Sequence, residues 1–119
     1  MKSSLFLVHW NTAEADEYAG RLKAAGWDVA VESKDGGRAY DFIRHNPPDV
    51  TVIYLTKLPS HGRQTAVALH SLKSTRAIPI VFVDGTDNDI RKTREKLPEA
   101  LFTTSAALVS FLSTIPPAG

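Results

Sequence analysis

The stretch "DVTVIYLTKLPSHG", Asp49 to Gly62, decides the fold class of this 119-residue chain. Its apolar run, Val50 to Leu55, is short, nearly continuous, and followed by a turn at Pro59. Such runs are typical of parallel strands that are buried on both faces, whereas half-exposed strands alternate apolar and polar residues. The phenol of Tyr54 is therefore predicted near the carboxyl end of a buried strand, where open parallel-sheet proteins usually place their functional side chains.

Similar apolar runs recur along the chain and alternate with segments of helical periodicity. We expect strands at 5–8, 27–31, 50–55, 78–83 and 100–102. The first helical segment carries an apolar stripe at three- and four-residue spacing, made by Ala15, Tyr18, Ala19, Leu22 and Ala25. Five β-α units predict an α/β fold: a flavodoxin-like, doubly wound parallel sheet of strand order 2-1-3-4-5, with helices on both faces in three layers.

The length and composition favour one globular domain. Hydrophobic residues make up 43% of the 119 residues and charged residues 23%, which is ordinary usage for a folded domain with a single core. We place the domain at 1–115 and a Pro-rich tail at 116–119, which either ends the protein or begins a linker.

The charge balance and residue usage exclude several classes of function. Lys and Arg number 14 against 13 Asp and Glu, so no basic excess favours nucleic acid. The chain has no cysteine, which removes disulfides, thiolate nucleophiles and thiolate metal sites. The N-terminus lacks a signal-peptide pattern and no window is long enough to span a membrane, so we expect a cytoplasmic protein without membrane contact.

The predicted strand order brings the residues after several strands to one crevice. The rim is expected to hold His9, Trp10 and Asn11 after the first strand, 54–57 after the third, 84–86 after the fourth and 103–105 after the fifth. These are the candidate functional residues.

Five segments together resemble a response-regulator receiver domain of bacterial chemotaxis and two-component signalling. They read "LFLVHWN", "LKAAGWDV", "PPDVTVIYLTKLPSHG", "LKSTRAIPIVFVDG" and "ALFTTSAALVSFL". The resemblance covers almost the whole chain in order and spacing. It implies the receiver fold and a part in a regulatory pathway.

The resemblance fails at the positions that carry receiver chemistry. A working receiver has an acidic pair after its first strand to hold magnesium, and the matching residues here are His9 and Trp10. Tyr54 stands where the family has its phosphorylated Asp, and Asp84 where it has a phosphoryl-binding Thr or Ser. Thr104 is the best match to the family's Lys.

These replacements predict a degenerate phosphorylation pocket. A phenol with an ordinary pKa of about 10 supplies no carboxylate nucleophile at neutral pH. Imidazole is a poor ligand for magnesium, indole is none, and an anion at Asp84 would repel a phosphoryl group. We therefore expect no aspartyl phosphorylation, no cofactor and no metal.

Other uses of the crevice remain open. His9, Tyr54 and Asp84 could form an acid-base set of an unrecognised enzyme that uses His9 and Asp84, although no activated nucleophile stands nearby. A hydrogen bond from the Tyr54 hydroxyl to His9 or Asp84 is the simpler expectation. Trp10 either plugs the vacated pocket, which we favour, or stands exposed as a contact residue.

The function expected from these features is that of a non-phosphorylatable pseudo-receiver that binds a protein partner. Two surfaces are candidates. One is the crevice rim around Trp10, Tyr54 and Lys57, and the other is the face made by the fourth helix, fifth strand and fifth helix, which carries Arg91, Lys92 and Arg94. Homodimerisation is a further possibility for such a face. The alternative function is sensing of a small molecule or ion at the remodelled crevice.

Overall fold

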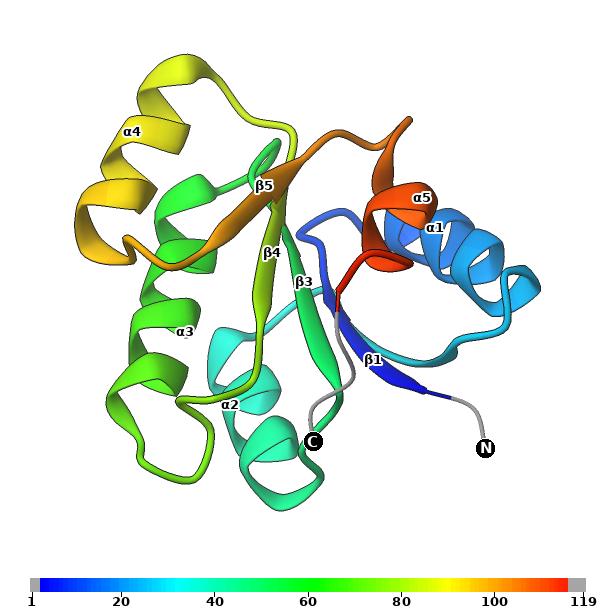
Figure 1. The fold of residues 1–119 in the computed structure, drawn as a ribbon, viewed down its shortest axis with the longest axis horizontal. Helices are drawn as coiled ribbons and strands as arrows, with labels where there is room; N and C mark the ends of the chain where they lie inside the picture. The colour runs from blue at the N-terminus through cyan, green and yellow to red at the C-terminus, as the bar shows by residue number, and fades with distance from the viewer. Residues whose placement is uncertain (1–2, 116–119) are drawn as a thin grey trace.

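The computed structural model describes residues 3–115, so the predicted tail at 116–119 lies outside the described residues. Strands and helices alternate from beginning to end (Figure 1). The strands are β1 (Ser4–Val8), β2 (Asp28–Glu32), β3 (Val50–Tyr54), β4 (Ile80–Val83) and β5 (Leu101–Thr103). The helices are α1 (Thr12–Ala24), α2 (Gly36–His45), α3 (Pro59–Ser71), α4 (Asp87–Lys96) and α5 (Leu108–Leu112).

The sheet confirms the predicted fold. All neighbouring strands are parallel, and their order is β2-β1-β3-β4-β5. Strand boundaries differ from the prediction by one or two residues, because β2 and β5 each begin one residue later and β4 begins at Ile80. The central strand β3 ends at Tyr54, and every one of its residues is buried.

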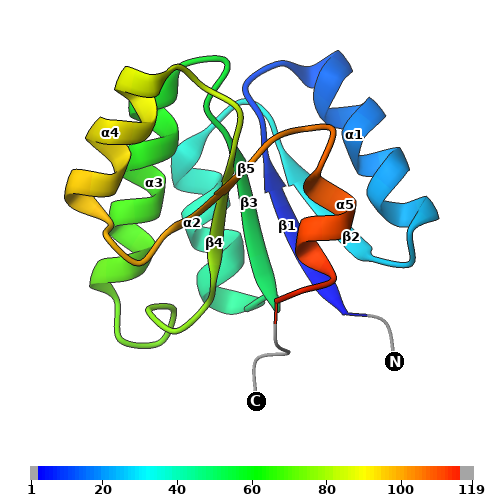
Figure 2. The ribbon, with the colours of Figure 1, turned by 45° about the horizontal axis from the view of Figure 1, so that its top comes forward.

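Helices cover both faces of the sheet, with α1 and α5 on one face and α2, α3 and α4 on the other (Figure 2). Alternate residues of each central strand enter opposite cores, as the pleat requires. In β1, Leu5 and Leu7 join the α1 side, whereas Phe6 and Val8 join the side of α2 and α3. The continuous apolar runs of the sequence therefore reflect burial on both faces.

Helix α1 begins directly after Asn11. The Asn11 side chain accepts a hydrogen bond from the Glu14 amide at 3.0 Å, which caps the helix. The predicted stripe is buried at Ala15, Ala19 and Leu22, but Ala25 is exposed because the helix ends at Ala24 and Ala25 serves as its C-cap.

The start of α3 is pressed against β3. Leu58 precedes it in the left-handed region, with φ of 44°, and its side chain is 52% exposed. A Cβ added at Gly62 would lie 2.8 Å from Ile53 Cγ2, so only glycine permits the observed approach of helix and strand. No helix among residues 3–115 has the length and apolar character needed to cross a membrane.

Replacing Gly62 by Ala is expected to destabilise the protein by about 1 to 2 kcal/mol, because the steric cost of overpacking exceeds the gain in helix propensity. The matched control is Gly20→Ala on the exposed side of α1, where an added Cβ meets nothing within 4 Å. This control should stabilise the protein by up to about 1 kcal/mol. Urea unfolding measures both changes, and equal stabilisation by the two substitutions would contradict the close approach.

Candidate functional site

The loops that follow the strands gather at one edge of the sheet, the upper edge in Figure 2. This edge brings His9 from the end of β1, Tyr54 from the end of β3 and Asp84 from the end of β4 into one region, as the sequence predicts. His9 and Tyr54 are both 1% exposed. The predicted crevice rim is therefore a largely buried cluster.

Three aromatic rings fill the centre of this cluster. The centroids of His9 and Tyr54 lie 4.5 Å apart with an interplanar angle of 6°. Tyr18 of α1 stacks on Tyr54 at 4.8 Å and lies 5.7 Å from His9. These separations are those of offset-stacked aromatic pairs, which contribute roughly 0.5 to 1.5 kcal/mol each beyond their burial. We refer to His9, Tyr18 and Tyr54 as the ring cluster.

The His9 imidazole has few polar contacts in spite of its burial. Its Nε2 lies 3.0 Å from Glu14 Oε2, which is the one ion-pair contact of the ring within residues 3–115. Burial lowers the pKa of His9, and nearby Lys57 lowers it further, whereas Glu14 and Asp84 partly oppose that shift. The ring is therefore held neutral at physiological pH.

The Tyr54 phenol is even further from ionisation than an ordinary tyrosine. Burial raises its pKa to about 12, although the neighbouring Ser105 hydroxyl partly opposes the rise. Among the described residues, the expected hydrogen bond from Tyr54 to His9 or Asp84 is not formed, so that prediction is wrong. The rings of Tyr54 and His9 stack instead, which places their faces rather than their polar atoms in contact.

Asp84 fastens two loops together beside the ring cluster. Its carboxylate accepts hydrogen bonds from the Ser105 amide, at 3.0 Å, and from the Ser105 hydroxyl. The residue adopts a left-handed backbone conformation with φ of 59°, which is uncommon outside glycine, asparagine and aspartate. We call this contact the Asp84–Ser105 latch, because it joins the loops that follow β4 and β5.

Thr104 lies outside the latch. It is exposed, and its Oγ1 accepts a hydrogen bond from the Ala107 amide at 3.2 Å. Thr104 therefore serves the turn before α5, while its neighbour Ser105 makes the contact with the crevice.

Trp10 is neither the plug over the ring cluster that we favoured nor a fully exposed side chain. It is half-buried above the amino ends of α2 and α3. Its ring lies edge-to-face with that of His61, and the ring centroids are 6.0 Å apart. An added Cβ at Gly36 would lie 3.6 Å from Trp10 Cη2, and one at Gly62 would lie 3.9 Å from its Nε1. The indole therefore packs beside these two glycines at ordinary van der Waals distance.

A surface groove of about 450 Å³ runs beside Trp10, between α2 and α3. Its lining combines aromatic, charged and amide side chains: Trp10, Lys34, Asp35, Tyr40, His61 and Gln64. The groove is separate from the ring cluster, none of whose members line it.

The basic residues of the candidate interaction surfaces are all exposed. Lys57 follows β3 at the rim. On α4, Arg91 bonds to Glu95 and Asn88 at 2.7 Å each, and the Arg94 guanidinium lies 4.8 Å from the centroid of the Phe102 ring. Lys92 makes no ion pair within the described part of the chain. Arg91 and Arg94 are therefore held in place, whereas Lys92 is left to solvent.

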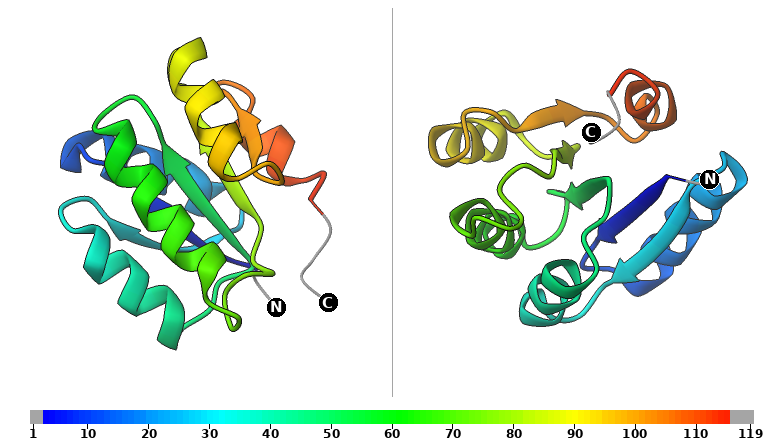
Figure 3. Two further views of the ribbon diagram at one scale, coloured as in Figure 1. Left: turned by 90° about the vertical axis from the view of Figure 1, so that its left-hand side faces the viewer. Right: turned by 60° about the horizontal axis from the view of Figure 1, so that its bottom comes forward.

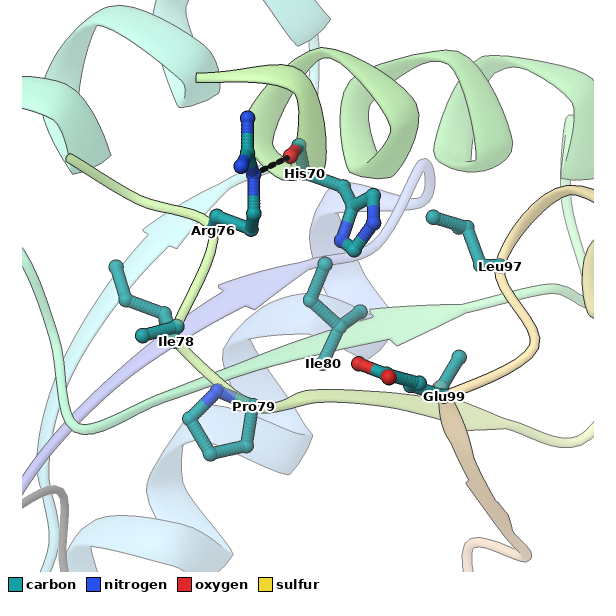
Figure 4. Close-up of a pocket in the computed structure, with 9 residues that line it drawn as sticks. His70, Arg76, Ile78, Pro79, Ile80, Leu97 and Glu99 are labelled. Atoms are coloured by element: carbon teal, nitrogen blue, oxygen red, sulfur yellow. Dashed lines mark hydrogen bonds between the residues drawn. The ribbon is translucent and has the colours of Figure 1, made fainter. Parts of the chain in front are cut away.

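The opposite end of the sheet has a small cavity of about 160 Å³ (Figure 4). His70 and Glu99 face it, but Arg76, which also lines it, directs its Nε to the His70 carbonyl oxygen at 3.1 Å. The remaining lining is mostly apolar, with Ile78, Pro79, Ile80 and Leu97. The cavity has too few convergent polar groups to be preferred as the functional site.

The side chains at the carboxyl edge do not fit a receiver-type magnesium site. Magnesium requires oxygen ligands in near-octahedral geometry. The positions after β1 hold His9, whose ring is stacked, and Trp10, which points toward α2 and α3. Asp84 already accepts two hydrogen bonds, and residues 3–115 contain no cluster of three potential metal-ligating side chains.

Solved structures with this fold are abundant. The chemotaxis protein CheY4 of Vibrio cholerae matches with a TM-score of 0.83 and 13% identity, over 98% of this chain and all of that one. A putative response regulator of Chloroflexus aurantiacus matches with a TM-score of 0.82 and 18% identity, over 95% of this chain and 96% of that one. The chain has the receiver-domain fold.

A third neighbour shows a metal-bound receiver domain. The receiver domain of a sensor histidine kinase from Pseudomonas aeruginosa, solved with magnesium in its active-site cleft, matches with a TM-score of 0.74. It is 19% identical to this chain, and the match covers 95% of this chain and 96% of that one. No protein-family model matches the chain, and no curated protein matches it.

Sequence reasoning missed two participants in the site. Tyr18 belongs to the apolar stripe of α1, and nothing in that periodicity indicates that its ring reaches Tyr54. Glu14, in the first turn of the same helix, lies beside His9. Ser105 is within the predicted rim, but the sequence favours its neighbour Thr104 as the match to the family's Lys, and only the loop geometry distinguishes the two.

The pH dependence of stability is expected to report the burial of His9. The pKa of His9 is lower in the folded protein than in the unfolded chain, where it is about 6.5. The neutral ring therefore contributes its full stabilisation to the folded state above about pH 6.5, and this stabilisation is lost as the pH falls below that value. The loss is at most about 1.4 kcal/mol per pH unit. Free energies of unfolding measured from about pH 7.5 to 5 test this expectation.

His9→Phe keeps a ring in the cluster but removes the titrating group, so its stability should fall less than that of the wild type over the same pH range. The exposed His45→Gln variant is the matched control and should follow the wild type. Parallel pH profiles for the wild type and His9→Phe would show that His9 has no part in the acid sensitivity.

Proposed function

We propose that this chain is a pseudo-receiver: a receiver-like signalling module that is not phosphorylated on an aspartate and that acts by binding a protein partner of a bacterial regulatory pathway in the cytoplasm. The observation that carries the proposal is the ring cluster. His9 and Tyr54 lie stacked and buried at the ends of β1 and β3, where receiver chemistry requires carboxylates.

The electrostatics of the site support the same proposal. Forming an acyl phosphate needs a carboxylate nucleophile, a cation and positive charge around the transferred phosphoryl group. Tyr54 has a pKa of about 12, and the Asp84 carboxylate adds negative charge at the same edge. The enzyme alternative has little support, because His9 and Asp84 are not hydrogen-bonded to each other in residues 3–115.

Two surfaces remain for a partner. The rim surface consists of the half-buried Trp10 and the exposed Lys57 and Leu58; the predicted rim residue Tyr54 is buried and does not belong to it. The α4 surface consists of Arg91, Lys92 and Arg94, all exposed. Leu58 is a large exposed apolar residue in a strained backbone conformation, a combination typical of functional loops. The α4 surface adjoins the edge strand β5, and a homodimer of this chain could also use it.

Small-molecule sensing is the second candidate. The groove of about 450 Å³ beside Trp10 favours it, because aromatic walls with a few polar groups are usual in ligand sites. In this alternative the ligand would bind between α2 and α3 rather than in the ring cluster.

Incubation with acetyl phosphate and magnesium, followed by intact mass measurement, tests the loss of phosphorylation. The wild type should gain no phosphoryl group while a working receiver treated in parallel is modified. Tyr54→Asp should also remain unmodified, since the metal ligands and the phosphoryl clamp would still be missing. A stoichiometric, base-labile phosphoryl adduct on the wild type would overturn the proposal.

Affinity capture from the native organism tests the interaction surfaces. Trp10→Ala with Lys57→Ala should lose a partner that the wild type retains if the rim is used, and Arg91→Ala with Lys92→Ala and Arg94→Ala should do so if α4 is used. Lys23→Ala on exposed α1 is the matched control. If all variants retain the same protein partners, both surfaces are excluded, and if the wild type captures none, small-molecule sensing is favoured.

A further inference from the structure

The outer edge of β2 is open. β2 pairs with β1, and along the other edge of β2 no strand of residues 3–115 is paired; Figure 3 shows β2, in light blue, at the border of the sheet. The Asp28 amide donates a hydrogen bond to the Ser3 carbonyl oxygen, and the Glu32 carbonyl oxygen accepts one from the His9 amide. The backbone polar groups of Asp28 and Glu32 therefore point toward β1. Because backbone direction alternates along a strand, the amide and carbonyl groups of Val29 and Val31 point outward.

An apolar groove of about 380 Å³ lies over β1 and β2 on the α2 face of the sheet. We call it the β2 groove; its lining includes Phe6, Ala30, Phe42, Asn46, Pro47 and Pro48. Phe42 is 44% exposed, and its ring centroid lies 5.2 Å from that of Phe6. The groove therefore has a preformed aromatic wall, and its β2 residues Asp28 and Ala30 alternate with Val29 and Val31, whose backbone groups point outward.

Acidic residues frame the apolar centre of this edge. Asp28 and Ala30 both line the β2 groove, and Glu32 follows on the same face of the strand. Asp28 is exposed, and its carboxylate takes part in no ion pair within the described part of the chain. The Glu32 carboxylate is fixed by the amides of Lys34 and Asp35, at 2.9 and 3.0 Å. The face thus presents an acid, an apolar residue and an acid at alternate positions.

We infer that the β2 groove binds an extended segment of a partner protein, which adds to the sheet as a strand beside β2 and presents basic, apolar and basic residues at alternate positions. Main-chain hydrogen bonds to Val29 and Val31 would supply the pairing, as in other strand-addition complexes. The central apolar side chain would lie over Ala30 and against Phe42. The two basic side chains would meet Asp28 and Glu32, since opposite charges favour cross-strand pairs.

The same charges argue against a second copy as the occupant. An antiparallel β2–β2 pair with its two-fold axis near Ala30 would place Asp28 opposite Glu32 at both ends. Like charges directly opposite each other destabilise strand pairs, and charges at an edge generally prevent self-association. The charge pattern therefore selects a partner of opposite sign. β2 and β5 form the two opposite edges of the sheet, so the β2 groove is separate from the α4 surface beside β5. The inference does not depend on the proposed function.

The test is an NMR titration of the isotope-labelled full chain with a short peptide containing Lys-Val-Leu-Val-Lys between Gly-Thr flanks. Shifts should concentrate at the amides of Val29 and Val31 and at the Phe42 ring. The analogue with Glu in place of both Lys should not bind. The basic peptide with N-methyl groups on the amides that face β2 should also lose binding, because its strand hydrogen bonds are removed.

Variants of the protein give the matched comparison. Asp28→Lys should lower the affinity for the basic peptide roughly fivefold, because it turns one attractive cross-strand pair into a repulsive one. Glu99→Lys, an equal charge change at an exposed site remote from the groove, should leave the affinity unchanged. Val31→Pro removes an outward amide at an edge where proline is tolerated, and it should weaken binding to a similar or greater degree.

Three outcomes would overturn the inference. If the acidic peptide binds as tightly as the basic one, the groove does not select basic side chains. If the chemical-shift changes centre away from β2, the peptide does not bind beside this strand. Concentration-dependent shifts of Val29 and Val31 without peptide would identify a second copy as the occupant instead.

Discussion

The stacking of His9 on Tyr54 is the contact around which the carboxyl edge of this protein is arranged. The two residues end neighbouring parallel strands, and the fold therefore brings their rings to a centroid distance of 4.5 Å. Tyr18 extends the contact from α1, so the volume at the strand ends is occupied by carbon-rich rings. The polar groups nearby are used elsewhere: Asp84 latches to Ser105, and Trp10 lies over the glycines of α2 and α3.

The sequence predicted the sheet well, because its central strands are buried on both faces and read as continuous apolar runs. Predictions were weaker where a run is short or bordered by apolar residues: Trp27 and Ala100 were included in strands that begin one residue later. At the site, position along the chain located His9, Tyr54 and Asp84 at one edge. It did not show that Tyr18 reaches the site or that Ser105, within the predicted rim, binds Asp84. These contacts depend on helix rotation and on backbone conformation, such as the left-handed Asp84.

The receiver-domain fold is present at 13% to 19% identity to the three solved structures. The strand ends of this chain hold the stacked rings of His9 and Tyr54, and a fold by itself does not define a function. The surfaces proposed for interaction are the rim, the α4 surface and the β2 groove, and all three lie outside the ring cluster. Under the proposed function, the buried rings support the fold and the exposed loops and edges bind the partner.

The most direct test of this account is whether the strand ends accept a cation and a phosphoryl group. NMR spectra of the isotope-labelled protein would be recorded with millimolar magnesium and then with added beryllofluoride, which mimics a bound phosphoryl group. We predict that the chemical shifts of His9, Tyr54 and Ser105 do not change, because the ring cluster and the Asp84–Ser105 latch leave no room for magnesium or beryllofluoride. Saturable shifts of these three residues would contradict it.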